Sequence, residues 1–247
     1  MSEDKGKEIR ERFRPTFENG GLWDYYIDLE RQFEDFLKYV PYLEGNKRTY
    51  SFRLASLILS IGAHIDSAFK EVAEYVDFSA KYPKLVRKIT KGKPTIRDYY
   101  PLAEFYELPE REVIFKCLQN RITLTPFKDY VKKGERVTTP YWWRVYNKVK
   151  HEFSDNFQKA TLQNTKDALA AAFLIHVCHI PSAVRLCEYG ILQGQLRKGR
   201  KYVRVGATFG ISPDIVKDSL KRNGTYPGFV ETSLFIFNGW KEAKKHD

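Results

Sequence analysis

The chain has 247 residues, 43% hydrophobic and 15% aromatic, so it can bury a substantial core and belongs to the globular class. Its formal net charge of +11 and pI of about 9.4 favour a polyanionic partner, nucleic acid first. Three cysteines without a CxxC pair argue against a disulfide framework or a thiolate zinc site. The charged N-terminus is unlike a signal peptide, and no apolar run approaches the roughly 18 residues of a membrane span. We therefore expect a cytoplasmic protein that makes no membrane contact.

The first third of the chain predicts two helices behind a tail. Residues 1–20 are charged and end in a turn signal, which indicates a mobile segment. Apolar residues recur every three or four positions over 23–40, with one charged misfit at Glu30, which predicts an amphipathic helix stopped by Pro41. The stretch 50–78 has the longest apolar stripe and predicts a long core helix.

Two polar residues, His64 and Asp66, lie beside that stripe. Both could be solvated or hydrogen-bonded side chains at the edge of the core. Alternatively, Asp66 borders an active groove and supports the residues that do the chemistry. The spacing leaves both interpretations open.

The region near 80–135 is interrupted by prolines and glycines and suggests an insertion between long core helices. It contains no recognisable chemistry. The expected elements are short helices over 84–90, 96–106 and 110–119, an extended segment over 122–125 and a turn over 132–136.

A helix is predicted to begin at Thr139, the expected N-cap, with Pro140 in its first turn, and to end soon after His151. Arg144, Asn147 or Lys148, and His151 fall at i, i+3 or i+4, and i+7, so they share one face. The opposite face is expected to pack through three apolar residues: Trp142, Val145 and Val149.

This polar line combines a phosphate-binding guanidinium fork with an imidazole, a side chain that titrates near neutrality. Those are the minimum groups for cleaving a phosphodiester without a metal. The alternative is a solvated polar face on a helix that packs through its tryptophans.

A second long helix is predicted after Thr161, its expected cap, with a stripe of Leu162, Leu169, Phe173 and Val177 and alanines that allow close helix packing. His176 and His179 at its end have no acidic or thiolate partner at ligand spacing, so we expect structural roles and no metal site. A further helix is expected over 182–195.

The C-terminal segment is basic. Arg197, Arg200 and Lys201 form a basic turn, residues 202–205 are β-prone, and 229–237 alternate like one strand. The stretch 205–216 could be the middle of a helix-turn-helix, or a turn followed by an ordinary surface helix.

The string Trp142-Trp-Arg-Val-Tyr-Asn-Lys-Val-Lys-His151, followed by an alanine-rich apolar helix, resembles the signature region of HEPN proteins. These are helical domains with an Arg-x4–6-His motif, here Arg144 and His151. The helix over 52–78 is similar to the first core helix of that family. The resemblance covers about 50–78 and 140–179. Where active members have a polar residue after the arginine, this chain has Val145.

We expect a mainly α fold, with a HEPN-like bundle over 21–195 and a small basic α+β appendage over 196–247, which lies outside the resemblance. The resemblance implies a four- or five-helix bundle. It also implies a homodimer in which two motifs face each other, and an RNA-cleaving activity of a toxin or phage-defence type, with an antitoxin or regulatory protein as a partner. On that pattern His151 is the general base or acid, Arg144 holds the scissile phosphate, and Asn147 orients the phosphate or the imidazole. No cofactor is implied.

Three function classes follow. The first is a metal-independent endoribonuclease centred on Arg144 and His151, with Lys148 and Lys150 binding phosphates beside them. The second is a non-catalytic nucleic-acid-binding or regulatory protein that uses the basic segment 196–223. The third is a small-molecule binder, for which the sequence offers no phosphate-cradling glycine loop.

Overall fold

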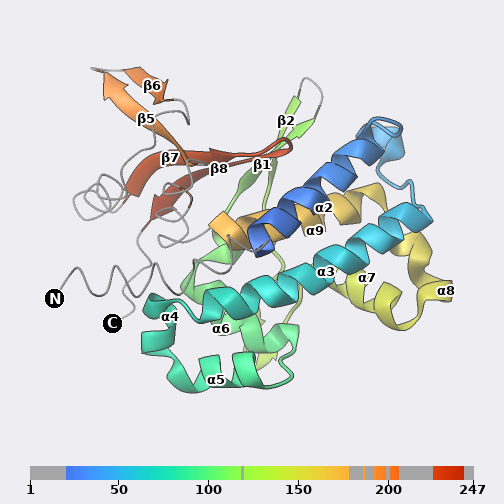
Figure 1. Cartoon of the computed structure of the whole chain (residues 1–247). Coiled ribbons are helices and arrows are strands. Elements are labelled where there is room, and N and C mark those ends of the chain that lie inside the picture. The colour runs from blue at the N-terminus through green and yellow to red at the C-terminus, as the bar shows by residue number, and fades with distance from the viewer. Residues whose placement is uncertain are drawn as a thin grey trace.

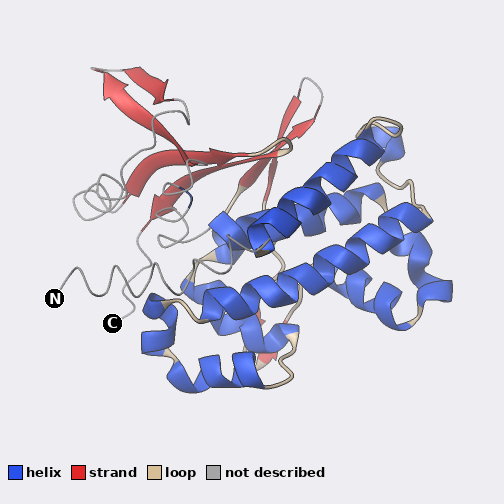
Figure 2. Ribbon diagram, viewed as in Figure 1, coloured by secondary structure: helices blue, strands red, loops and turns tan. Residues whose placement is uncertain are grey.

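The computed structural model describes residues 21–117, 120–177, 186, 192–198, 201–205 and 225–241. Within these ranges, helices form one side of the molecule and an antiparallel sheet lies against them on the other side (Figure 1, Figure 2). The expectation of a mainly helical protein with a smaller β portion is therefore confirmed. The α-helices are α2 (Leu22–Leu37), α3 (Phe52–Ala73), α4 (Val76–Lys81), α5 (Pro83–Lys91), α6 (Tyr100–Phe105), α7 (Tyr141–His151), α8 (Phe153–Asn156) and α9 (Leu162–Val177), with short 3₁₀ turns η1 (Glu44–Asn46), η2 (Ile96–Tyr99), η3 (Leu108–Glu110) and η4 (Phe157–Lys159).

The main sheet combines strands from the middle and the end of the chain. Its order is β2-β1-β8-β7-β5-β6, and each neighbouring pair is antiparallel. The strands are β1 (Val113–Cys117), β2 (Asn120–Leu124), β5 (Leu192–Lys198), β6 (Lys201–Val205), β7 (Thr225–Glu231) and β8 (Phe235–Lys241); β3 (Lys132–Lys133) and β4 (Arg136–Val137) form a separate hairpin. The β1–β2 hairpin of the expected insertion thus pairs with β8 of the expected C-terminal appendage.

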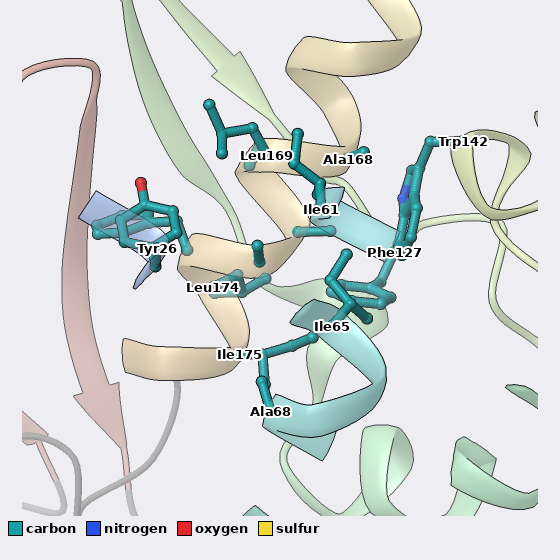
Figure 3. Packing of buried hydrophobic residues seen from close by; sticks show 14 of the residues in the cluster. Tyr26, Ile61, Ile65, Ala68, Phe127, Trp142, Ala168, Leu169, Leu174 and Ile175 are labelled. Carbon is teal, nitrogen blue, oxygen red and sulfur yellow. The ribbon is translucent and has the colours of Figure 1, made fainter. Parts of the chain in front are cut away.

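Helix α9 is the centre of the core. Nearly all of its side chains are buried, which is the pattern of a helix covered on every side. Figure 3 shows residues of α3, such as Ile61 and Ile65, lying against residues of α9, such as Leu169 and Ile175. The alanines of α9 allow this approach, as the sequence predicted. On another side, Phe173 stacks on Phe235 at 5.6 Å between ring centroids and so attaches the sheet to the helices.

The first two helices have nearly the predicted extents. α2 ends at Leu37, three residues before the expected end, and a turn leads to Pro41. α3 begins after Ser51, whose Oγ accepts a hydrogen bond from the backbone N–H of Leu54 at 3.1 Å, an N-cap. The helix expected to reach residue 78 instead breaks at Tyr75, which adopts an extended backbone before α4. Residues 1–20, the expected tail, lie outside the described ranges.

In the middle region, the helices expected over 84–90 and 96–106 are confirmed as α5 and as η2 with α6. The extended segment over 122–125 is confirmed as part of β2, and the turn over 132–136 as the β3–β4 hairpin. The helix expected over 110–119 is wrong, because residues 113–117 form strand β1. Its side chains alternate between buried and half-buried positions, as a strand between β2 and β8 requires.

Two C-terminal expectations are corrected. The helix expected over 182–195 is wrong at its end, since residues 192–195 belong to β5; most of the rest of that range is not described. The single strand expected over 229–237 is two antiparallel strands, β7 and β8, joined by a turn at 232–234. In this turn the Thr232 N–H donates to the Phe235 carbonyl at 2.9 Å, and the Phe235 N–H donates to Thr232 Oγ1 at 3.1 Å. The β-prone stretch 202–205 is confirmed as β6. The helix-turn-helix candidate lies outside the described residues after Val205.

Of the helices in the described ranges, α3 alone is long and apolar enough to cross a membrane by length and composition. From the sequence we expected no apolar run of this length, because charged residues interrupt the stretch that forms α3. About half of the relevant window is buried inside the protein, and α3 packs against α2, α7 and α9, as the core helix of a globular protein does.

Candidate functional site

Helix α7 carries the predicted motif and starts one residue later than expected. Pro140 occupies the N-cap position with an extended backbone, and no side chain caps the helix, so the N-cap expected at Thr139 is wrong. The first helical hydrogen bond runs from the Arg144 N–H to the Pro140 carbonyl at 3.1 Å. Proline fits this place because its missing N–H would have no helical partner there.

The buried face of α7 is wholly aromatic and β-branched. Trp142, Val145 and Val149 are buried as predicted, and Trp143 and Tyr146 are buried as well. The indole N–H of Trp142 donates to the Pro126 carbonyl at 2.7 Å, and its ring meets Phe127 edge-on, which holds the start of α7 against the loop before β3. This packing fixes the rotation of the helix and therefore decides which residues face solvent.

α7 also packs very closely on α3 at Gly62. A Cβ placed on Gly62 would lie 2.3 Å from Cδ2 of Tyr146, far inside van der Waals contact. The glycine therefore leaves the space that the Tyr146 ring occupies. The sequence placed Gly62 in the α3 stripe but gave no sign of its partner, because the two residues are far apart in the chain.

The polar line of α7 faces solvent. Arg144, Lys148 and His151 are exposed and Asn147 is half-buried, as the helical spacing predicted. The structure brings these residues onto one face, with about 10 Å of helix rise between Arg144 and His151. The guanidinium of Arg144 lies over the ring of Tyr141, 5.2 Å from its centroid. It therefore points one turn toward the N-terminus, away from His151.

The helix ends at His151, as predicted, because Glu152 leaves the helical conformation. After His151 the chain forms a short helix, α8, followed by η4. Lys148, Lys150 and His151 occupy the last turn of α7, where the negative end of the helix dipole favours cations. This stabilisation of the helix end accounts for the basic residues here on the structural interpretation of α7.

Within the described part of the chain, His151 and Arg144 have no hydrogen bond or ion pair to another protein group, although Arg144 rests on Tyr141. Lys150 lies over the Tyr146 ring at 5.5 Å. An exposed imidazole beside uncommitted cations can exchange protons with a bound ligand and can bind its phosphates.

Val145, at the position where active HEPN proteins have a polar residue, is 2% exposed and faces the core. A polar side chain here would be buried among the helices and would not join the exposed line. Asn147 is the amide that does reach the edge of that line.

Asp66 is held by residues other than those of the motif. It accepts a hydrogen bond from Tyr99 Oη at 2.7 Å, which ties α3 to η2, and another from Lys70 Nζ, one turn along α3, at 2.7 Å. In the described residues no hydrogen bond joins it to Arg144 or His151. This geometry matches the structural interpretation of Asp66, a satisfied polar side chain at the edge of the core.

Two residues of the basic turn predicted in the C-terminal segment lie on the antiparallel pair of β5 and β6, where Arg197 pairs in register with Tyr202 and Lys198 with Lys201. Arg200 lies outside the described residues. The pair of strands projects from the far end of the sheet, on the side of the molecule opposite α7 (Figure 1). The structure thus separates the two basic groups that the sequence proposed for nucleic-acid binding.

Sequence reasoning missed a buried pair of histidines. His64 Nε2 and His176 Nε2 lie 2.8 Å apart and share a hydrogen bond between α3 and α9. His64 is 2% exposed, and burial lowers its pKa to about 4, so its ring is neutral at pH 7. Trp23 and Tyr26 of α2 pack against His176. The structural role expected for His176 agrees with this contact, whereas His179 is not described.

The charged misfit Glu30 belongs to the same buried region. Tyr26 Oη donates to Glu30 Oε2, and the backbone N–H of Leu234 donates to Glu30 Oε1 at 2.7 Å. Burial raises the pKa of the Glu30 carboxyl. The side chain therefore links α2 to the turn between β7 and β8. Its place in an apolar stripe was the one sequence signal of this role.

In the described ranges, no group of three or more His, Cys, Asp or Glu side chains is arranged to hold a metal ion. The chain matches no protein-family model, no curated protein and no solved structure. Interpretation of the site therefore rests on the exposed line of α7 and on the chemistry of its residues.

Proposed function

We propose that this protein is a metal-independent endoribonuclease with a HEPN-like bundle, acting in the cytoplasm in a toxin or phage-defence type system. The observation that supports the proposal is the exposure of Arg144 and His151 on one face of a helix whose opposite face is fixed in the core. The net charge of +11 supports an RNA substrate. The α3–α9 core, with α7 against it, provides a rigid frame for these side chains.

In the proposed mechanism, His151 takes the proton of a ribose 2′-hydroxyl, whose oxygen then attacks the adjacent phosphorus. The bond from phosphorus to the 5′-oxygen breaks, which leaves a 2′,3′-cyclic phosphate and a 5′-hydroxyl. Arg144 leaves the Tyr141 ring and binds the phosphate, where its charge stabilises the extra negative charge that develops on the oxygens. Asn147 orients the phosphate or the imidazole, and Lys148 and Lys150 bind neighbouring phosphates.

The reaction needs two proton transfers, one from the 2′-hydroxyl and one to the departing 5′-oxygen. His64 and His176 are buried, so His151 is the exposed histidine among the described residues. A second copy of the chain would bring a second His151. We therefore propose a homodimer with two motifs facing each other, and an antitoxin or regulatory protein as a further partner.

The test is incubation of single-stranded RNA with the protein in EDTA, beside His151→Ala and Arg144→Ala variants whose melting temperatures are checked. The proposal predicts cleavage by the wild type, loss with His151→Ala, and a strong reduction with Arg144→Ala. Equal cleavage by all three proteins would assign the activity to another site or to a contaminant.

The second candidate is a non-catalytic nucleic-acid-binding protein that uses the segment 196–223. The position of Arg197 and Lys201 on the projecting pair of strands β5 and β6 favours it. It predicts that RNA binding survives His151→Ala but weakens when Arg197, Arg200 and Lys201 are changed to Gln. The slope of log affinity against log salt concentration should also become shallower, by about one for each phosphate contact removed.

A further inference from the structure

Four aromatic side chains gather on the surface where α3 begins and where η4 follows α8. We call Tyr50, Phe52, Phe153 and Phe157 the aromatic platform. Phe52 is 68% exposed, Tyr50 48% and Phe153 40%, which is unusual for rings of this size. Phe52 falls in the apolar stripe that predicted the core helix over 50–78, but the structure leaves its side chain exposed. Nothing in the sequence indicates that Phe52 gathers with Phe153, because the two residues are far apart in the chain.

Three rings of the platform are nearly parallel. Phe52 and Phe157 have centroids 4.9 Å apart and an angle of 14° between their planes. Phe153 is 6.3 Å from Phe52 at 13° and 6.1 Å from Phe157 at 20°. Tyr50 meets Phe157 edge-on at 5.8 Å. A parallel group of rings with large exposed area offers flat faces on which another flat ring can stack.

The backbone beneath the platform is fixed. Ser51 caps α3 between Tyr50 and Phe52, and Tyr50 forms a β-bridge with Thr161. The N–H of Leu162, the first residue of α9, donates to the Thr49 carbonyl at 2.8 Å. The platform therefore sits on the ends of two core helices, and a ligand stacked on it would not have to order a loose loop.

The charge around the platform suits a polyanion. Arg48 and Arg53 are exposed and flank Tyr50 and Phe52 in the chain, and Lys150 and His151 directly precede the α8 side. The exposed acidic residues on the α8 side are Glu152, which accepts a hydrogen bond from Asn156, and Asp155. On the α3 side, Asp35 of α2 interacts with Arg53, whereas Arg48 and Lys150 have no ion pair in the described residues. Rings interleaved with such cations are the pattern of single-strand nucleic-acid sites.

We propose that the aromatic platform stacks an unpaired base of single-stranded RNA beside the phosphate on which His151 acts. This inference rests on the proposed function for the position of the phosphate. Only one residue separates His151 from Phe153, so the imidazole and the platform are within reach of adjacent nucleotides. Because stacking needs a base that has left its helix, the platform selects single-stranded RNA over duplex RNA.

The test uses a single-stranded oligonucleotide of about ten nucleotides with 2′-O-methyl groups, which blocks cleavage through the 2′-hydroxyl. It contains 2-aminopurine, a fluorescent base that dims when it stacks. Wild-type protein should quench this fluorescence. The double variant Phe52→Leu with Phe153→Leu should quench it weakly and raise the Kd about 5- to 100-fold. The single variant Phe52→Leu, at the most exposed ring, should show an intermediate effect.

Two controls separate stacking from general binding. Tyr39 is 86% exposed and its ring contacts no other aromatic ring in the described residues, so Tyr39→Leu should leave Kd and quenching unchanged. An abasic oligonucleotide with the same phosphates should bind wild type and the double variant equally. Melting temperatures and sedimentation of each variant verify its fold and its oligomeric state.

The outcomes distinguish this inference from the proposed nuclease. Unchanged Kd and quenching in the double variant would overturn the platform, even if RNA is cleaved in EDTA. Quenching lost in the double variant, without cleavage by the wild type, would support the platform on a protein that only binds. A double variant that no longer forms dimers but binds RNA as before would overturn the inference and make the platform a contact between copies.

Discussion

The close contact between α3 and α7 makes a sharp prediction for Gly62→Ala. An added methyl group would lie 2.3–2.5 Å from three atoms of the Tyr146 ring. The ring is buried and has Trp143 at 4.9 Å between centroids, so it has little room to move aside. Overpacking of this kind costs about 1–3 kcal/mol, whereas replacing a helical glycine by alanine gains up to about 1 kcal/mol.

With so short a contact, we expect the upper part of the overpacking range and a net loss of about 2 kcal/mol in the free energy of unfolding. For a chain of this length, that loss corresponds to a melting temperature lower by about 4–8 °C. Urea and thermal unfolding followed by circular dichroism measure both quantities. Gly45→Ala is the matched control, because no atom lies within 4 Å of its added Cβ, and it should change stability by less than about 0.5 kcal/mol.

The cause is tested by combining Gly62→Ala with Tyr146→Leu. If the clash is the reason for the loss, alanine at 62 should be neutral or stabilising once the ring is gone, with a coupling of about 2 kcal/mol between the two changes. If Gly62→Ala is neutral or stabilising in the protein that keeps Tyr146, the described packing of α7 on α3 is refuted.

Three further predictions concern buried groups. His64 has a folded pKa of about 4 against 6.5 unfolded, so the unfolded state binds more protons between those values. Stability should be complete above pH 6.5 and fall by about 3 kcal/mol on acidification to pH 4, with a shallower fall in His64→Leu, measured by urea unfolding across pH. Glu30→Ala should cost about 2–4 kcal/mol, because it leaves the Tyr26 hydroxyl and the Leu234 N–H without their acceptor, whereas Glu30→Gln should cost less; equal losses would contradict the hydrogen-bond account. Val145→Asn should lower stability by about 2–3 kcal/mol without raising RNA cleavage, since it buries an amide in the core; a more active variant would show that this position does reach the site.

Local patterns predicted the parts of the fold that depend on local interactions. The exposed and buried faces of α7 follow from the helical period alone, and α9 was recognised from its apolar, alanine-rich sequence. Strand β1 was mistaken for a helix because its identity depends on pairing with β8, more than a hundred residues later. The pairs that organise the interior, His64 with His176 and Glu30 with Leu234, are equally remote in the chain. For Glu30, a charge in an apolar stripe was a usable sign that a distant partner existed.

In the candidate site, too, local patterns predicted some features and contacts between distant parts of the chain decided others. Spacing placed Arg144, Asn147, Lys148 and His151 on one exposed face, which the structure confirms. It could not show that the Arg144 guanidinium rests on Tyr141, nor that Phe52 and Phe157 lie together at the surface. These contacts arise only after tertiary packing has fixed the rotation of α7 and the start of α3.

The most direct test of the central claim is cleavage in EDTA of an RNA oligonucleotide in which one nucleotide at a mapped cleavage position carries a 2′-deoxyribose. If His151 activates the 2′-hydroxyl, the wild type will cut the all-ribose strand there, leave a 2′,3′-cyclic phosphate, and fail at the deoxy position, and His151→Ala will cut neither strand. Cleavage at the deoxy position, or undiminished cleavage by folded His151→Ala, would contradict a metal-independent ribonuclease centred on Arg144 and His151.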